Sequence, residues 1–382
     1  MTLAHSTVTV NPPEFGNEID SGIYNDGTAS VSPGSATMTL TDSAFEGGAI
    51  LNDGFGGSAI AAINNSTFSD KAGFGNRGSG GSATVNNSTF RGAGISNAFA
   101  TLTVNDSTVS ENSVDSGISN RDGTVTLNNS IIHDNSSYIG GIDNQCGIVT
   151  LNNSTVSGNS GEQTGGISNY CLGGTGAVTL NSSTVSNNSG LEIFNYGGPG
   201  ATATFTVSNS TVSGSSRITI YTSGVEDGIG LLVLRNSTVS NNANLPGEFI
   251  SAIQNISFDG GSSTVEIGNS ILNSLTPGFN IGSSGTVISH GYNLSSDSAG
   301  GLLNGPGDII NTNPMLGPLK NNGGPTKTHA LLLNSPAIDA GDPNFDPDAF
   351  ETPLLYDQRN GPGFLRVVNG RIDIGAFESK HP

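Results

Sequence analysis

The chain repeats one short pattern of apolar and polar positions eleven times. A clear copy is residues 148–160, which read I-V-T-L-N-N-S-T-V-S-G-N-S. In every copy a central serine has apolar residues five and three positions before it and two positions after it. Three apolar columns at a short period are typical of a solenoid, in which each repeat buries its apolar side against the next. The central serines are Ser6, Ser43, Ser66, Ser88, Ser107, Ser130, Ser154, Ser183, Ser210, Ser237 and Ser270.

The pattern predicts short strands that are joined by bends. In the copy T-V-T-L-N-N-S-I-I the first four residues alternate, so Val125 and Leu127 are expected to point inward and the threonines outward. Asn128 and Asn129 are expected to end this strand, because asparagine tolerates turn conformations. A second strand follows with Ile132 inward, and a third strand precedes the pattern at the motif G-I-x-N.

Three short strands in about 25 residues, without helical periodicity, predict an all-β parallel β-helix of about ten to eleven rungs. A leucine-rich repeat has a similar period, but its leucine spacing is absent from the sequence. A propeller blade needs about 40 residues, which is longer than this period.

Two sets of asparagines are expected to stack into structural ladders, since equivalent residues of successive rungs lie about 4.8 Å apart. The first set is the asparagine of G-I-x-N: Asn97, Asn120, Asn144 and Asn169. The second set directly precedes the central serine: Asn129, Asn153, Asn209 and Asn236. The triplet N-S-T also matches the glycosylation sequon, but its repetition at a turn favours a structural role.

The two cysteines, Cys146 and Cys171, occupy the same phase of adjacent rungs. At a rung spacing of about 4.8 Å, their Cα atoms fall within the range of a disulfide, which would fit an exported protein. A pair of reduced neighbours is an equal alternative. No cysteine and histidine cluster accompanies them, so we expect no zinc site.

The formal net charge of −19 limits the partners of the protein. Such a surface repels phosphate backbones, so we expect no nucleic-acid partner. Abundant carboxylates leave weak Ca²⁺ binding open. No stretch is long and apolar enough for a membrane helix, and the start of the chain has no signal-peptide pattern. Instead Met1 and Leu3 already occupy apolar columns, so the chain is expected to begin inside a rung.

The repeats assign no catalytic residue. A polysaccharide lyase needs a basic residue with Ca²⁺ or arginine near the substrate carboxylate, yet the basic residues of the repeats are dispersed among different phases. A hydrolase needs clustered acids, but Asp115, Asp122, Asp134 and Asp143 also differ in phase. The nearest match to the G-H-G of polygalacturonase-like hydrolases is S-H-G at His290.

The repeat fades in the last part of the chain, and the composition changes. Ten of the sixteen prolines fall from Pro306 onward. We therefore divide the chain into β-helix repeats at 1–285 and a C-terminal module at 286–382. The phrases of the module are N-P-M-L-G-P-L (313–319), N-N-G-G-P-T (321–326), S-P-A-I-D-A-G (335–341), D-Q-R (357–359) and D-I-G-A-F-E (373–378).

These phrases resemble, in the same order, the choice-of-anchor Q domain of bacterial surface proteins, over about residues 286–378. The resemblance implies a right-handed β-helix of the pectin-lyase-like class that is followed by this module. It also implies an exported protein, either secreted or at the cell surface. The upstream repeats are similar to those of polymorphic outer-membrane and adhesin-like proteins.

The C-terminal module is expected to close the open end of the rod, because a last rung exposes backbone groups and an apolar cross-section. The apolar runs 329–333 and 372–377 would cover that cross-section. Asp339, Asp357, Arg359 and Asp373 are candidates for ion pairs or for a Ca²⁺ site, and structural pairing is favoured over catalysis.

The sequence favours a non-catalytic extracellular or cell-surface rod for adhesion, surface display or weak glycan binding. Its partner would be a carbohydrate or another cell-surface component. The alternative is a carbohydrate-active enzyme, a lyase or a hydrolase, with its site in a lateral groove. A third hypothesis, binding of ice or mineral through threonine ladders, is weakened by outward positions that mix threonine with serine, asparagine and glycine.

Overall fold

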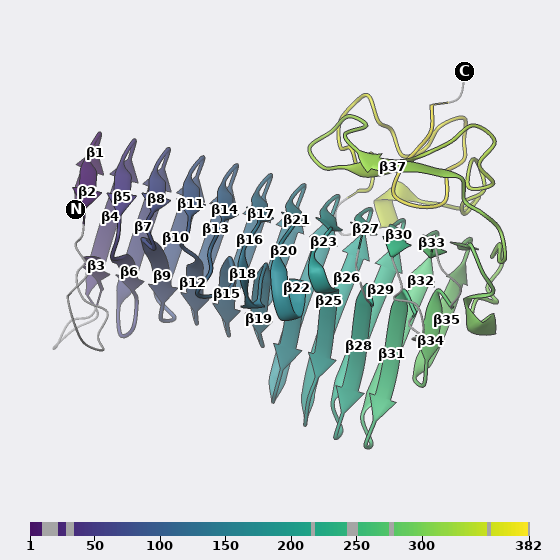
Figure 1. Cartoon of the computed structure of the whole chain (residues 1–382), viewed down its shortest axis with the longest axis horizontal. Helices are drawn as coiled ribbons and strands as arrows, with labels where there is room; N and C mark the ends of the chain where they lie inside the picture. The colour runs from purple at the N-terminus through teal and green to yellow at the C-terminus, as the bar shows by residue number, and fades with distance from the viewer. Residues whose placement is uncertain are drawn as a thin grey trace.

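The computed structural model describes residues 1–9, 22–27, 34–214, 218–242, 251–274, 279–349 and 353–380. These residues wind into a parallel β-helix of about ten turns, in which three long sheets run along the rod (Figure 1). Each turn adds one strand to each sheet, and neighbouring strands pair in parallel. The prediction of an all-β parallel β-helix is confirmed.

We name the three sheets A, B and C. Sheet A contains β1 (Thr2–Ala4), β4 (Ser35–Thr41), β7 (Ser58–Asn64), β10 (Gly81–Asn86), β13 (Thr101–Asn105), β16 (Thr124–Asn128), β20 (Ile148–Asn152), β23 (Gly174–Asn181), β26 (Ala201–Ser208), β29 (Ile229–Arg235), β32 (Ser262–Gly268) and β35 (Thr286–Gly291). Sheet B contains β2 (Thr7–Thr9), β5 (Ala44–Glu46), β8 (Thr67–Ser69), β11 (Thr89–Arg91), β14 (Thr108–Ser110), β17 (Ile131–His133), β21 (Thr155–Ser157), β24 (Thr184–Ser186), β27 (Thr211–Ser213), β30 (Thr238–Asn242), β33 (Ile271–Ser274) and β36 (Leu294–Ser295).

Along the chain, each strand of sheet C follows a strand of sheet B and precedes the next strand of sheet A. It contains β3 (Ile23–Asp26), β6 (Ala49–Asp53), β9 (Gly73–Arg77), β12 (Ile95–Ala98), β15 (Ile118–Arg121), β19 (Ile142–Gln145), β22 (Ser160–Cys171), β25 (Ser189–Gly197), β28 (Ile220–Val225), β31 (Ile253–Phe258) and β34 (Ile281–Ser283), while β18 (Ser136–Ile139) pairs with β22. A separate antiparallel pair is β37 (Leu316–Lys320) with β38 (Thr328–Leu331), and two short 3-10 turns are η1 (Ala299–Gly301) and η2 (Pro347–Ala349).

The apolar columns of the sequence form the core inside the three sheets. Leu127 on β16 and Ile132 on β17 are fully buried. Phe68 stacks between Phe45 and Phe90 of the neighbouring rungs, with ring centroids 5.7 Å and 4.2 Å apart. Each large apolar side chain that is removed from water contributes roughly 1.5–3 kcal/mol to folding, so repetition of these columns supplies most of the stabilisation.

The first rung departs from this pattern. Met1 is 62% exposed and Leu3 is half-buried, although both occupy apolar columns. Among the described strands, β1 pairs only with β4, so it is covered on one side only.

The central serines form a continuous hydrogen-bonded row along the rod. The backbone N–H of each central serine donates to the Oγ of the next one, at 3.0–3.4 Å, from Ser6 through to Ser270. The row ends where Ser270 donates to Oδ1 of Asn293. The residue before each serine has a positive φ of 45–51°, a conformation that asparagine tolerates well. The sharp bend between sheets A and B therefore coincides with this left-handed residue, which is asparagine in seven of the eleven copies and His5, Asp42, Asp106 or Ser182 in the others.

The asparagines of G-I-x-N lie inside the turn between sheets C and A. Asn97 donates to Asn120, Asn120 to Asn144 and Asn144 to Asn169, at Nδ2–Oδ1 distances of 2.8–2.9 Å. Each of these amides also donates to a backbone carbonyl of the turn, such as that of Gly123 for Asn120. Buried amides in such a chain satisfy groups that would otherwise be desolvated without partners.

The asparagines before the central serine bond less regularly. Asn129 donates to Asp106, Asn209 donates to Ser182, and Asn236 accepts from Asn269. Asn153 accepts from Asn360 of the C-terminal segment. The continuous outer row is instead formed one position earlier, where each Nδ2 donates to the Oδ1 of the preceding rung: Asn64, Asn86, Asn105, Asn128, Asn152 and Asn181.

The C-terminal segment, residues 313–380, lies along the flank of the rod over sheet B (Figure 1). Its residues Leu331, Ile374 and Phe377 pack with Ile271 of β33 and Leu294 of β36. The expectation that the runs 329–333 and 372–377 cover the last rung is therefore corrected, because the outward apolar side chains of sheet B provide their packing surface.

The end of the apolar core contacts a different part of the chain. Ala299 and Leu303 join the main core cluster, and Leu302 packs against it. The strands β35 and β36 follow residue 285 and still pair in sheets A and B. The domain boundary expected at 285/286 thus falls inside the last turns of the β-helix.

We expect Asn120→Ala to lower the free energy of unfolding by about 2–3 kcal/mol, because the variant removes three buried hydrogen bonds: the one from Asn97, the one to the Gly123 carbonyl and the one to Oδ1 of Asn144. Urea unfolding followed by circular dichroism measures this loss. The matched control is Asn105→Ala in the half-buried outer row, where water replaces the lost bonds and the cost stays below about 1 kcal/mol. Equal losses in the two variants would contradict the assignment.

Candidate functional site

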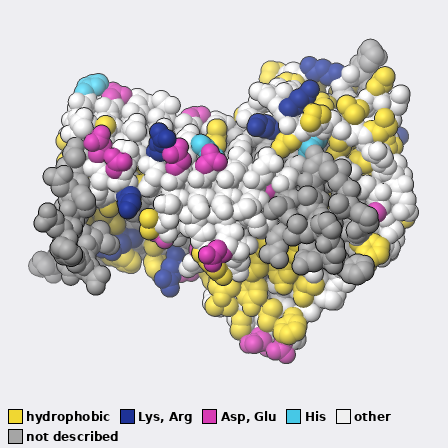
Figure 2. Space-filling view, viewed as in Figure 1, with side chains coloured by type: hydrophobic (Ala, Val, Ile, Leu, Met, Phe, Trp, Pro, Cys, Tyr) yellow, Lys and Arg dark blue, Asp and Glu magenta, His cyan; other side chains and the backbone are white. Residues whose placement is uncertain are grey.

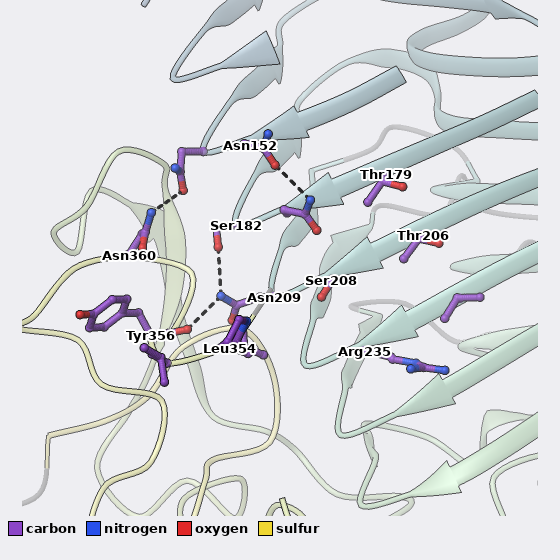
Figure 3. Close-up of a pocket in the computed structure, with 15 residues that line it drawn as sticks. Asn152, Thr179, Ser182, Thr206, Ser208, Asn209, Arg235, Leu354, Tyr356 and Asn360 are labelled. Carbon is purple, nitrogen blue, oxygen red and sulfur yellow. Dashed lines mark hydrogen bonds between the residues drawn. The ribbon is translucent and has the colours of Figure 1, made fainter. Parts of the chain in front are cut away.

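A groove of about 700 Å³ lies between the outward face of sheet A and the C-terminal segment (Figure 3). Its floor belongs to β20, β23, β26 and β29, and its wall is formed by residues 353–360. The lining residues are Asn152, Asn153, Thr179, Asn181, Ser182, Thr206, Ser208, Asn209, Val233, Arg235, Pro353, Leu354, Leu355, Tyr356 and Asn360. Ten of these fifteen residues carry an amide or a hydroxyl group.

The floor of the groove consists of side chains in register. Thr179 on β23 pairs with Thr206 on β26, which pairs with Val233 on β29. Two residues further along each strand, Asn181 pairs with Ser208. Because side chains of a strand alternate between its two faces, both columns point away from the core into the groove.

The wall is tied to the floor by amide hydrogen bonds. Asn209 donates to the carbonyl of Tyr356 at 3.2 Å and to Oγ of Ser182 at 3.0 Å (Figure 3). Asn360 donates to Oδ1 of Asn153 at 3.1 Å. Leu354 contributes an apolar side to the groove. The two edges of the groove are thus held at a defined separation.

Gln358 anchors the wall behind the groove. Its side chain is fully buried, donates to Oγ1 of Thr184 at 2.9 Å and accepts from Oγ1 of Thr211. The neighbouring His329 is also buried and bridges Oγ of Ser213 to a backbone carbonyl. Burial lowers the pKa of His329, although the hydrogen bond to that carbonyl acts in the opposite direction. The C-terminal segment therefore binds the outward hydroxyls of the repeated phrase itself.

The Ca²⁺ candidates Asp357 and Asp373 are bonded to protein donors. Asp357 forms a buried ion pair with Arg359, whose guanidinium lies between the rings of Phe364 and Phe377, 4.2 Å and 3.8 Å from their centroids. This arrangement combines a charge-assisted pair with cation–π contact.

The third candidate, Asp339, lies beside Asp373. Asp373 accepts from the backbone N–H of Asp339 at 2.8 Å and from the backbone N–H and the hydroxyl of Ser379. Among the described residues, no group of three or more His, Cys, Asp or Glu side chains is placed to hold a metal ion.

Two buried glutamates that the sequence pattern did not indicate have strongly raised pKa values. Burial raises the pKa of Glu378 to about 8, and the charge of Asp373 adds to this effect while Arg366 opposes it. Burial likewise raises the pKa of Glu192 to about 8, although Asn188 donates to its carboxyl group. Glu378 lies outside the repeats, and Glu192 replaces the glycine of G-I-x-N in its rung, so periodicity carried no signal for an acid at either position.

Charged side chains gather just beyond the groove. Arg235 is the charged residue of the lining, and its guanidinium lies 3.9 Å from Glu266 on β32. His290 on β35 contacts the same carboxylate at 3.1 Å. His290 is the residue of the S-H-G motif, and the structure brings it to this cluster.

The dispersed aspartates of the repeats stay apart. Asp134 contacts His133 at the end of β17, whereas Asp143 lies on β19 of sheet C and accepts from Gln145. Burial raises the pKa of Asp143. Asp115 lies in the loop between β14 of sheet B and β15 of sheet C. Because these carboxylates belong to different elements, they do not form the close pair that glycoside hydrolysis requires.

Aromatic side chains stack on the outward face of sheet C. Tyr170 stacks on Tyr196, and Phe194 stacks on Tyr221, with ring centroids 5.1 Å and 5.5 Å apart. Figure 2 shows hydrophobic side chains gathered over the long ends of β22, β25, β28 and β31. Each ring covers the face of the next one, so we interpret the stacking as a contact that stabilises neighbouring rungs.

Cys146 and Cys171 form a disulfide, with their Cα atoms 4.6 Å apart. Cys146 follows β19 and Cys171 ends β22, so the bond joins adjacent strands of sheet C at the same phase. Among the described residues, no helix has the length and apolar character that crossing a membrane would require.

No protein-family model matches the chain, and no curated protein matches it. Among solved structures, the chain is similar to the crystal structure of pectate lyase Pel9A, with a TM-score of 0.40 and 15% sequence identity. The alignment covers 92% of this chain and 89% of that chain. A likeness at this level carries no argument about a site or a reaction.

We expect Glu378→Gln to reduce the loss of thermal stability that the wild type undergoes as the pH rises. The folded protein keeps a proton on Glu378 up to about pH 8, whereas the unfolded chain releases it near 4.5. The stability linked to this raised pKa is present below 4.5 and is lost as the pH rises towards 8. Calorimetric Tm values at about pH 5 and about pH 9 measure the difference.

Glu192→Gln is expected to change the pH dependence in the same direction, for the same reason. Glu226→Gln, on an exposed turn, is the control and keeps the wild-type dependence. A Glu378→Gln variant whose Tm falls as steeply as that of the wild type would contradict the assignment of the proton to this residue.

Proposed function

We propose that this protein is a non-catalytic, exported β-helical rod that binds an uncharged, extended glycan in the groove beside sheet A. The observation that carries the proposal is the lining: threonine, serine and asparagine side chains form both the floor and part of the wall, and Arg235 is the charged side chain.

The chemistry of the lining fits sugar hydroxyls. Amides such as Asn181 offer both donors and acceptors, and the hydroxyls of Thr179 and Thr206 offer either. Leu354 adds an apolar surface for the C–H side of a sugar ring. A few polar groups in a concave site are the usual source of orientation for small ligands. The net charge of −19 disfavours polyanions, which leaves uncharged glycans as the favoured class.

Two observations support a location outside the cytoplasm, at the cell surface or secreted. The disulfide between Cys146 and Cys171 is of a kind that persists in oxidising compartments. The phrases of residues 313–378 resemble the choice-of-anchor Q domain of exported surface proteins. Glycan binding at that location would serve adhesion or surface display.

A carbohydrate-active enzyme is the second candidate, and one observation favours it. Glu266 and His290 form a close pair of titratable groups beside Arg235, at the end of the groove. Such a pair is able to move a proton. We rank this candidate second because the groove itself contains no carboxylate among its lining residues.

We expect Thr206→Arg to weaken binding of an uncharged oligosaccharide at least about tenfold, because the longer side chain fills the floor of the groove. A panel of gluco-, manno-, xylo- and galacto-oligosaccharides, tested by isothermal titration calorimetry, provides the measurement. Thr108→Arg, on the outward side of β14 in sheet B, is the matched control and keeps the wild-type affinity.

The same panel separates the two candidates. If the wild type releases new reducing ends or unsaturated sugars, and His290→Ala abolishes that release, the enzyme replaces the binding rod as the conclusion. If no member of the panel binds, the proposed glycan site fails.

A further inference from the structure

The floor of the groove is part of a longer column that runs along the rod. Threonines occupy the same outward position on six successive strands of sheet A, each paired in register with the next: Thr84, Thr103, Thr126, Thr150, Thr179 and Thr206. The last two belong to the groove, and the first four lie upstream of it. The column therefore continues the groove floor without a change of register.

A row of amides accompanies this column two positions away. Asn181 donates to Asn152, Asn152 to Asn128 and Asn128 to Asn105, at 2.8–3.0 Å. All of these amides point the same way, so each bond polarises the next. The row ends in the groove at Asn181, whose partner on the next strand is Ser208. A ligand hydroxyl at this end would meet a pre-oriented amide.

The strands of this face carry no charge over most of its length, although the protein is strongly acidic. The eight strands of sheet A from β4 to β26 contain no Asp, Glu, Lys, Arg or His. On the same rungs the other two sheets carry Arg91, His133, Arg77 and Arg121. The uncharged face is continuous with the groove, and it is followed on β29 by Arg235.

We propose that the ligand is a long, linear, uncharged polysaccharide that lies along the rod axis, over the threonine column and the asparagine row. This inference rests on the glycan site proposed above. Successive strands are about 4.8 Å apart, which is close to the length of one sugar in an extended chain. Each rung then offers one threonine and one asparagine to one sugar, except that the last strand offers Thr206 with Ser208. The groove encloses one end of this chain, between Thr206 and the wall at 353–360.

The test compares short and long ligands. The wild type is titrated with uncharged linear gluco-, manno- and xylo-oligosaccharides, from trisaccharide to decasaccharide. We expect affinity to rise at least about tenfold with length, because contacts beyond the groove add to those inside it. Thr103→Arg on β13 blocks the column upstream of the groove, so it loses most of this gain while trisaccharide affinity stays within about twofold.

Thr108→Arg is the matched control on the same rung, because it places the same charge on sheet B. It is expected to keep the full length dependence. A Thr103→Arg variant that binds the decasaccharide as tightly as the wild type would overturn the extended track while leaving the groove intact as a glycan site. If the wild type binds no oligosaccharide and adsorbs to ice or to a mineral surface, both the track and the proposed glycan site are overturned.

Discussion

The register between successive rungs is the constraint on which every other feature of this molecule depends. A shift of one residue in a strand would turn its inward side chains outward, and the core columns, the amide rows and the threonine column would all be interrupted together. The row of central serines opposes such a shift. Each serine accepts from the backbone of one rung and donates to a carbonyl of its own turn, for example at Ser130. These bonds form only when every rung has the same register. The polar groups of the turn therefore determine the register, and the apolar core supplies most of the stability of the fold.

The sequence predicted the parts of the structure that are local and periodic. The apolar columns, the three strands per rung and the asparagines near Asn120 all recur with the repeat, so one copy explains the others. Contacts that occur once were not predictable in this way. Gln358 bonds to Thr211 across 147 residues, and the charged residues around Glu378, which are Asp357, Arg366 and Asp373, belong to the non-repeating C-terminal segment. The sequence therefore indicated the rod, but not the groove, because the groove exists only where a non-repeating segment folds back onto it.

The rod and the C-terminal segment contribute different properties to the candidate site. The rod supplies a flat, regular and uncharged surface, whose side chains are held by their strands. The C-terminal segment supplies concavity, since its wall at 353–360 converts part of that surface into a groove. The segment is itself held by buried polar contacts, among them Gln358 and the pair between Asp357 and Arg359. Shape and chemistry of the site thus come from separate parts of one chain.

The contact of the C-terminal segment with sheet B also has a mechanical consequence. In a solenoid each rung touches only its neighbours, so the turns separate one after another when the rod is pulled from its ends. The segment contacts Thr184, Thr211, Thr238 and Ile271, which lie on four successive strands. These four turns are joined by a second load path, and the N-terminal turns are not among them. Under tension the N-terminal half would therefore yield first, while the half that carries the groove would keep its shape.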